Sequence, residues 1–367
     1  MIIYLSLYVY IIILYVVFLI LKKQNESHLL KIILILAAII PMYLLCVLKS
    51  SSVGTDTNAY IEAYKNSNSN ASFLGRDYGY RILSFAFSKV GLPFKVFSCF
   101  CYSIIYGGLF LYVYKKVPKY LEFILFFVSL GLFTFGLSAL RQMMCMGMFF
   151  FAMAFFNSKN KWSYLIFYIF AFLGISIHIA GIIFIVYPLL SQFNFNKNHS
   201  IPCLLLSILL ILCGGSFFNF LYYDIGLMTY APSKSGTNKT FILFSIIYVV
   251  IIAVFIFQNK INSLPRIKNK YLSDVFAIEF KEDVAINFYP GLIAVLLVGF
   301  GIYSMVNSRL AYFYYPSLFL VFSSVIDSFK NKYMRLMVRI LTFTFLFIYL
   351  LFIIRNDSGI IRYSVGL

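Results

Sequence analysis

Apolar stretches close to 20 residues long recur from one end of the chain to the other, and they constrain the fold more than any other feature. As an α-helix, such a stretch spans a hydrocarbon core of about 30 Å. The hydrophobic fraction of the 367 residues is 62%, and only 11% are charged. A water-soluble globule cannot cover that much apolar surface. We therefore expect an all-α polytopic membrane protein and exclude a soluble enzyme, a secreted disulfide scaffold, a disordered chain and a membrane β-barrel.

About twelve transmembrane or re-entrant helices are predicted, within a single membrane domain of residues 1–367. The segments are 2–21, 29–48, 93–114, 119–137, 139–157, 162–176, 178–192, 201–221, 241–257, 286–306, 310–326 and 337–354. The first lacks the basic start and cleavage site of a signal peptide, so we expect it to be a retained span. The pair 162–176 and 178–192 is short, and forms either two crossings or a re-entrant hairpin.

Basic loop residues set the predicted orientation. With the amino terminus outside, 18 of the 30 Lys and Arg residues lie inside and 12 outside, as the positive-inside rule favours. The net charge of +18 therefore reflects topology, and we expect no nucleic-acid partner. Two long loops, 49–92 and 222–240, are then outside, and 258–285 is cytoplasmic. Residues 77–90 have the pattern of an amphipathic helix lying in the membrane interface.

Four polar clusters lie on the predicted outer side. The first follows the second span, and the second follows the fourth span. The first is Gly54-Thr55-Asp56-Thr57-Asn58-Ala59-Tyr60, in which Asp56 is a candidate general base. The alternative is a turn with a capping Asp before a short helix at 57–65. The second is Ser138-Ala139-Leu140-Arg141-Gln142. Arg141 at a helix N-terminus is suited to clamping a pyrophosphate. The alternative is an arginine that extends to lipid headgroups.

The other two clusters lie further along the chain. His178, in GISIHIAGIIF, is a candidate base for a sugar hydroxyl, and the alternative is a buried core histidine. Arg309 opens NSRLAYFYYP, whose aromatic rings either stack on sugars or belong to an interfacial aromatic belt. We interpret the six cysteines as small packing residues, because they lie in apolar stretches without metal-ligand spacing.

In this order, five motifs resemble the EpsG/Wzy-type family of bacterial polysaccharide polymerases. They are VGTDTNAY, DYGYRILSFAFSKVG, LRQMMCMGMFFFA, SIHIAGIIFIVYPLL and NSRLAYFYYP. One departure is Asp77, where family members tend to carry Glu before the GY pair. The resemblance implies a GT-C-like glycosyltransferase at the outer face of the bacterial cytoplasmic membrane. It would polymerise oligosaccharide repeat units of O-antigen or a related surface polysaccharide, carried on undecaprenyl pyrophosphate.

The clusters supply the residues for this reaction. His178 or Asp56 would act as the base, with His178 favoured. The pyrophosphate would be bound by Arg141 and Arg309, helped by Arg76 or Arg81. Sugar contacts are predicted for Thr55, Tyr60, Asp77, Tyr80, Gln142, Tyr312 and Tyr315. No cofactor or metal is expected, because arginine can neutralise the charge.

We expect three kinds of partner: the lipid-linked oligosaccharide, membrane lipids and a chain-length regulator protein. Alternative functions are a flippase for lipid-linked sugars, an O-antigen ligase and an acyltransferase. A flippase should show an internal repeat and a central cavity. No repeat is apparent, and the arginines concentrate on the outer side. An acyltransferase would place His178 on the cytoplasmic side.

Overall fold

The computed structural model describes residues 2–21, 27–68, 77–193, 282–300, 309–356 and 363–366. Every regular element in these ranges is a helix, which confirms the all-α prediction for this part of the chain. The chain divides into two compact units, Met1–Ile185 with Thr342–Leu367, and Val186–Leu341. The predicted spans 201–221 and 241–257 and the loop 222–240 lie outside the described residues.

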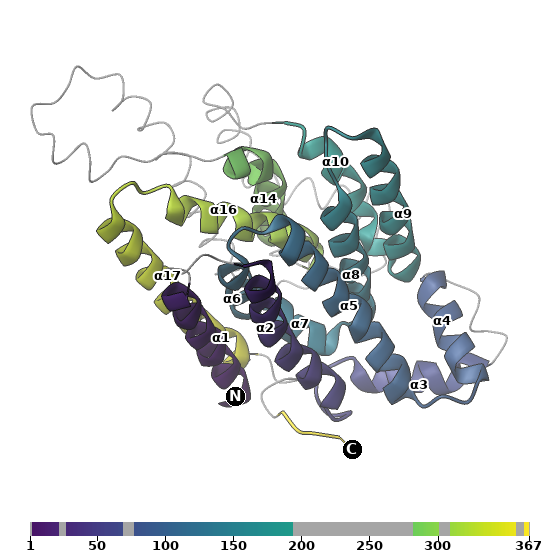
Figure 1. The fold of residues 1–367 in the computed structure, drawn as a ribbon. Coiled ribbons are helices and arrows are strands. Elements are labelled where there is room, and N and C mark those ends of the chain that lie inside the picture. Colours follow the sequence, from purple (N-terminus) through teal and green to yellow (C-terminus); the bar gives the residue numbers. More distant parts are fainter. Residues whose placement is uncertain are drawn as a thin grey trace, which may run out of the picture. The chain divides into compact units, whose positions relative to one another are not determined.

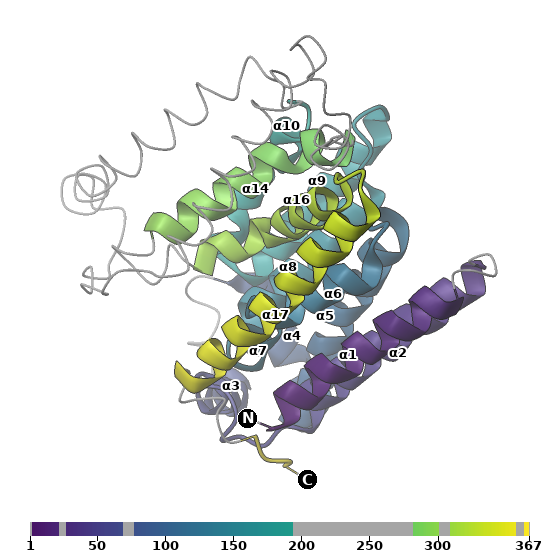
Figure 2. The same ribbon diagram turned by 90° about the vertical axis from the view of Figure 1, so that its left-hand side faces the viewer.

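The first unit is a bundle of helices (Figure 1). Its α-helices are α1 (Ile2–Leu21), α2 (His28–Leu48), α3 (Thr57–Lys65), α4 (Tyr78–Lys89), α5 (Phe94–Lys116), α6 (Tyr120–Ser129), α7 (Leu132–Ser138), α8 (Leu140–Phe155) and α9 (Lys161–Ile177). A 3₁₀ helix, η2 (Asn66–Asn68), follows α3, and another, η4 (Ile179–Val186), follows α9. Figure 2 shows α1 and α2 side by side as an antiparallel pair.

The second unit contains fewer described elements. They are α10 (Tyr187–Leu190), α14 (Glu282–Phe300), η6 (Tyr312–Tyr314) and α16 (Tyr315–Asp327). Helix α14 packs against α16. Helix α17 (Lys332–Asn356) begins in this unit and ends in the first. Its Arg339 donates to Asp327 at the end of α16, with 2.8 Å between Nη2 and Oδ1.

Five of the described helices are long and apolar enough to cross a membrane. They are α1, α2, α5, residues 309–327 and α17. A sixth is obtained if α6 and α7 are taken together, although they are bent by 53°. The break falls at Gly131, whose φ of 91° lies in the left-handed region that glycine adopts without strain. The predicted span 119–137 is therefore a bent pair, and the described residues support five or six spans where about twelve were predicted for the whole chain.

Close helix packing fixes the middle of the first unit. A Cβ added at Gly147 of α8 would lie 2.7 Å from the Cα of Ile105 in α5. A Cβ at Gly108 of α5 would collide with the carbonyl of Gly147. Small residues let helix backbones approach closely, which is a usual way for helices to associate in membranes. The two glycines therefore hold α5 against α8, and α8 in turn packs on α9.

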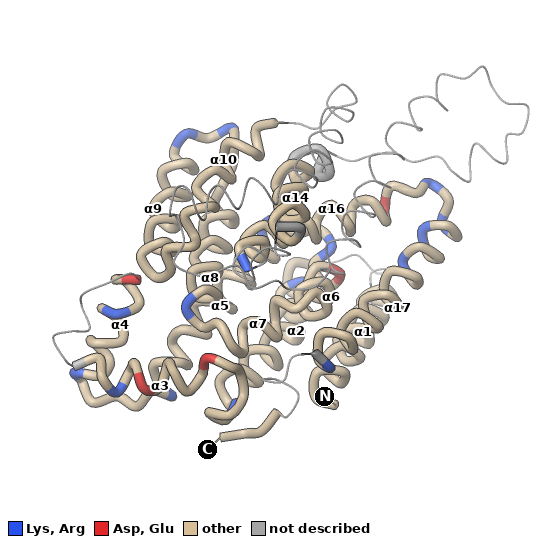
Figure 3. Tube along the Cα trace, turned by 180° about the vertical axis from the view of Figure 1, so that it is seen from behind, with Lys and Arg blue, Asp and Glu red and all other residues tan. Residues whose placement is uncertain are grey.

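The helices of the first unit alternate in direction, so their connections gather at two ends. We call the site end the one that carries residues 49–60, α4, the start of α8 and His178. The opposite end carries Lys31, residues 115–119 and residues 156–161. Charged residues lie mainly at helix ends and in loops (Figure 3). Alternation of this kind groups the polar clusters at one end of the helices, whereas the outward orientation of that end stays a prediction.

Candidate functional site

Asp77 is the centre of a polar cluster at the site end. Its Oδ2 atom accepts a hydrogen bond from Arg141 Nη1 at 2.9 Å and lies 3.3 Å from His178 Nδ1. Its Oδ1 atom accepts from the backbone N–H of Ile179 at 3.0 Å. Asp77 precedes α4, Arg141 is in the first turn of α8, and His178 follows α9. One carboxylate thus joins three separate segments of the chain.

The backbone around Asp77 is shaped for this position. Asp77 has φ 68° and ψ 46°, a left-handed conformation that Asp tolerates better than most residues. Two residues later, Gly79 lets α4 lie directly on α9. A Cβ at Gly79 would be 3.0 Å from the carbonyl carbon of Ser176. The Asp-Tyr-Gly motif therefore places the carboxylate against the end of α9.

Asp77 is ionised in this setting. Its side chain is only 7% exposed, and burial by itself would raise the pKa of the carboxyl. Hydrogen bonds from His178 and Ile179, together with the charges of His178 and Arg141, outweigh burial and lower the pKa below its usual value. Asp77 is therefore a permanent anion at neutral pH, held between a guanidinium and an imidazole.

Arg141 combines this ion pair with an open side. Its side chain is 38% exposed. Its Cζ atom lies 5.5 Å from the ring centre of Tyr60 and 5.9 Å from that of Tyr80, a distance at which cation–π attraction acts. Tyr60 and Tyr80 are both buried. A guanidinium carries five N–H donors, and the bond to Asp77 uses one of them. Others can meet a phosphate that arrives from the exposed side.

His178 is oriented through its Nδ1 atom. The backbone N–H of His178 donates to the Gly174 carbonyl at 3.0 Å, and the backbone carbonyl of His178 accepts from Cys145 Sγ at 3.7 Å. Its side chain is 23% exposed. A carboxylate at Nδ1 favours the tautomer with the proton on that atom. The lone pair on Nε2 is then the one that can accept a proton from a substrate.

Other predicted residues lie near the cluster without joining it. Asp56 is the N-cap of α3 but makes no side-chain capping bond, and it accepts from Thr55 Oγ1 at 3.1 Å. The Thr55 N–H donates to Ser138 Oγ at 3.3 Å. Gln142 is buried next to Arg141. In the part of the chain that the structure describes, Asp56 has no hydrogen bond or ion pair to Arg141 or His178.

The remaining predicted residues lie on α4, in the second unit, or outside the described part. Arg81 is on α4, one turn after Asp77. Arg309 belongs to the second unit, as do Tyr312 and Tyr315, whose rings meet edge to face at 5.0 Å. Arg76 lies outside the described residues. A contribution of Arg309 to the same site stays a prediction.

Lys49 is a site-end residue that the sequence analysis missed. It follows α2 directly, and its Nζ atom donates to Thr57 Oγ1 at 2.9 Å and to the Leu137 carbonyl. Burial lowers the pKa of Lys49 to about 8, against the opposing effects of Cys46 and Asp56. The signal was a lysine directly after an apolar span, at the end that the sequence predicts to be outside and where the positive-inside rule disfavours it.

Metal-binding residues do not gather anywhere in the described ranges. Within them, no group of three or more His, Cys, Asp or Glu side chains lies close enough to hold an ion. The described cysteines, Cys46, Cys99, Cys101 and Cys145, are unbridged.

The fold and the cluster define a class: a multi-pass helical membrane protein with a buried carboxylate, an arginine and a histidine gathered at one end of its helices. The profile of the EpsG family matches residues 32–365, nearly the whole chain, and the chain belongs to this family. The family consists of polysaccharide polymerases, so the chain has the features of a membrane polysaccharide polymerase. Neither the curated proteins nor the solved structures give a match.

Proposed function

We propose that this protein is a membrane glycosyltransferase that joins oligosaccharide repeat units carried on undecaprenyl pyrophosphate, at the outer face of the cytoplasmic membrane. The observation that carries the proposal is the Asp77–Arg141–His178 cluster. A polymerase of this type needs a base for the acceptor hydroxyl and a cation for the leaving diphosphate. The cluster supplies both, one on each side of a shared carboxylate.

The reaction follows from these groups. The acceptor hydroxyl oxygen attacks the anomeric carbon of the donor sugar, and a C–O glycosidic bond forms. His178 Nε2 takes the hydroxyl proton. The bond between the anomeric carbon and the phosphate oxygen breaks, and the electron pair leaves with undecaprenyl pyrophosphate. Arg141 stabilises the charge that develops on this leaving group.

Asp77 is a positioning residue in this scheme. Its Oδ2 atom contacts both Arg141 and His178, so it sets the distance between base and cation. It also stabilises the imidazolium that forms when His178 accepts a proton, as a carboxylate does in other His-containing sites. With His178 protonated, the three side chains carry a net positive charge, which favours the departing diphosphate.

The test is polymerisation by the purified full-length protein in liposomes, supplied with purified lipid-linked repeat units. The proposal predicts products of increasing length with release of undecaprenyl pyrophosphate, and both should form about 10²-fold more slowly in Arg141→Ala. Movement of the substrate across the bilayer without chain growth would indicate a flippase. A parallel reaction also contains lipid A core, and transfer to that acceptor without self-polymerisation would indicate a ligase. Either result contradicts the proposal.

A further inference from the structure

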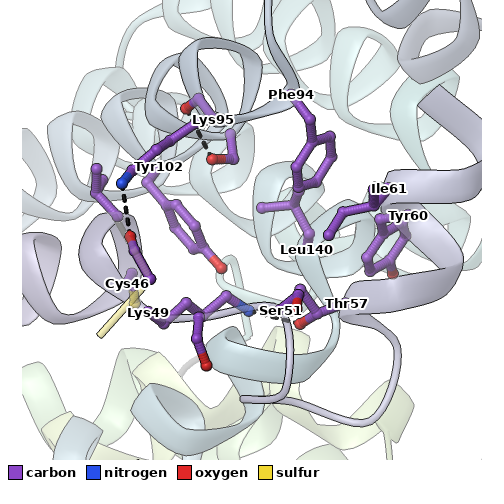
Figure 4. Close-up of a pocket in the computed structure, with 14 residues that line it drawn as sticks. Cys46, Lys49, Ser51, Thr57, Tyr60, Ile61, Phe94, Lys95, Tyr102 and Leu140 are labelled. Carbon is purple, nitrogen blue, oxygen red and sulfur yellow. Dashed lines mark hydrogen bonds between the residues drawn. The ribbon is translucent and has the colours of Figure 1, made fainter. Parts of the chain in front are cut away.

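A cavity lies at the site end, near the Asp77–Arg141–His178 cluster. Its volume is about 280 Å³, and all the residues that line it belong to the first unit. The side chains of Lys49, Thr57, Tyr60, Phe94, Lys95 and Tyr102 surround it (Figure 4). Tyr60 also lies against Arg141. Tyr60 therefore borders both the cavity and the proposed catalytic cluster.

The charge of this cavity is unbalanced. Two lysines line it, and none of its lining residues is Asp or Glu. Lys49 Nζ donates to a hydroxyl and a backbone carbonyl, and Lys95 Nζ donates to the Gly366 carbonyl at 2.6 Å. These acceptors are neutral. Since an ammonium has three donors, at least one N–H of each lysine has no partner among the described residues.

The chain builds the cavity from distant segments. Residues 363–366 return to the site end, where Val365 forms an antiparallel bridge with Lys49 and the Gly366 N–H donates to the Leu48 carbonyl at 3.0 Å. The hydroxyls of Thr57 and Ser98 and the rings of Tyr60, Phe94 and Tyr102 complete the lining. Aromatic faces and hydroxyls are groups that bind sugars. The volume is near the lower limit of small-molecule sites, about 300 Å³, and suits one sugar ring better than a lipid tail.

We propose that this cavity binds an acidic sugar of the saccharide substrate, with Lys49 and Lys95 contacting its carboxylate or phosphate. The proposal rests on the proposed function in taking the ligand from a saccharide substrate. It assigns the cavity as a specificity subsite next to the site of bond formation. The negative charge of Asp56 acts on Lys49, but Asp56 does not line the cavity. A neutral sugar would therefore leave the two ammonium groups with no anion inside the cavity, so the subsite favours repeat units with an acidic residue.

The test is a binding titration, which requires no catalysis and so can fail independently of the polymerase assignment. Full-length protein in nanodiscs of phosphatidylcholine is titrated with methyl glucuronide, methyl glucoside and a hexose 1-phosphate, followed by saturation-transfer NMR. We expect both acidic sugars to bind at least about tenfold more tightly than the glucoside. In Lys49→Gln, we expect the affinity for both acidic sugars to fall by about tenfold. Because only the ammonium form attracts an anion, affinity should fall as the pH rises above about 8 and Lys49 loses its proton.

Two further variants keep the test decisive. Lys95→Gln changes an exposed residue, so it should fold even if Lys49→Gln does not, and it should weaken acidic-sugar binding several-fold. Lys115→Gln, at the other end of α5, should bind like the wild type. Equal affinity for all three sugars, or no effect of either cavity variant, would overturn the proposal. Displacement of the glucuronide by phosphatidylglycerol in the wild type but not in Lys95→Gln would instead assign the cavity to lipid headgroups.

Discussion

The two ends of the first unit use their charges differently. At the opposite end, Lys31 Nζ donates to the Tyr114 carbonyl at 2.8 Å, and Lys116 Nζ donates to the Phe156 carbonyl at 2.7 Å. These lysines cap the carboxyl ends of α5 and α8, where helix dipoles favour cations. A buried carboxylate lies near that end as well, because Glu122 in the first turn of α6 accepts from the Tyr15 hydroxyl at 2.8 Å. At the site end, the buried carboxylate of Asp77 contacts both Arg141, in the first turn of α8, and His178, which follows α9.

The difference separates charges that serve folding from charges that serve chemistry. Capping lysines satisfy carbonyls that every helix end exposes. A buried ion pair adds little to stability, because desolvation offsets the attraction between its charges. The Asp77–Arg141–His178 cluster is therefore hard to explain as a folding device, whereas it has the composition of a site for proton and phosphate transfer.

Replacing the base should have the largest effect. His178→Ala removes the acceptor of the hydroxyl proton, and we expect polymerisation in liposomes to slow by about 10³-fold, within the range for general bases. The rate is measured as sugar incorporated per enzyme over time. A rate close to that of the wild type would assign the base elsewhere, with Asp56 as the first residue to test.

Replacing the cation should have the next largest effect. Arg141→Ala should slow polymerisation by about 10²-fold, because the leaving diphosphate loses a donor. Arg141→Lys should recover only part of the rate, since an ammonium lacks the planar fork of a guanidinium. Full activity of both variants in the same liposome assay would exclude the clamp.

Asp77→Asn should have an intermediate effect. The amide keeps the size of the side chain but removes the charge that orients Arg141 and His178. We expect polymerisation to slow by about tenfold, with kcat affected more than KM, as for a residue that orients a base. Asp77→Glu restores the charge, but its side chain is longer and it tolerates the left-handed backbone less well than Asp or Asn, so rates are compared at equal amounts of folded protein. Asp77→Glu should therefore be faster than Asp77→Asn, and the reverse order would show that charge is not what Asp77 supplies.

Changes at the opposite end should have a small effect on catalysis. Lys116→Gln removes a bond to a carbonyl, which costs about 1 kcal/mol of stability. We expect its polymerisation rate to stay within about twofold of the wild type once the amount of folded protein is matched. A loss of rate as large as that of Arg141→Ala would mean that the charges of the opposite end also serve catalysis.

The smallest expected effect is on the stability of the folded protein at acidic pH. The pKa of Asp77 is lower in the folded state than its ordinary value. The stability that this carboxylate contributes is therefore complete above the ordinary pKa, about 3.9. It is lost as the pH falls through the folded value. Thermal unfolding in detergent between pH 3 and 6 should show this loss in the wild type, and Asp77→Asn should show a flatter profile.

Much of the helical framework could be predicted from hydropathy. The first span was predicted at its observed bounds, and the second began one residue late. The bend between α6 and α7 was not predicted, because apolar composition continues through Ser129 and Gly131 and only backbone geometry reveals the break. Residues 178–192 form a 3₁₀ helix followed by a single α-helical turn, Tyr187–Leu190, which hydropathy cannot distinguish from a short span.

The candidate site was predicted in its parts but not in its connections. Alternating helices bring the end of α2, the start of α8 and the end of α9 to one side, so the clusters of Asp56, Arg141 and His178 could be grouped from topology alone. The central role of Asp77 depends on a left-handed turn and on the fit of Gly79 against α9. Neither the left-handed turn nor the close fit of Gly79 produces a periodic pattern in the sequence. A role for Asp56 as base stays a prediction, as does one for Arg309.

Chemical rescue of His178→Ala tests the central claim most directly. The variant is reconstituted with purified lipid-linked repeat units, and polymerisation is followed as imidazole is added above its own pKa. We predict a rate that rises with imidazole and saturates, and no rescue of Arg141→Ala under the same conditions. Normal chain growth by His178→Ala without imidazole would contradict the account, because the histidine beside Asp77 would then not be the group that accepts the proton.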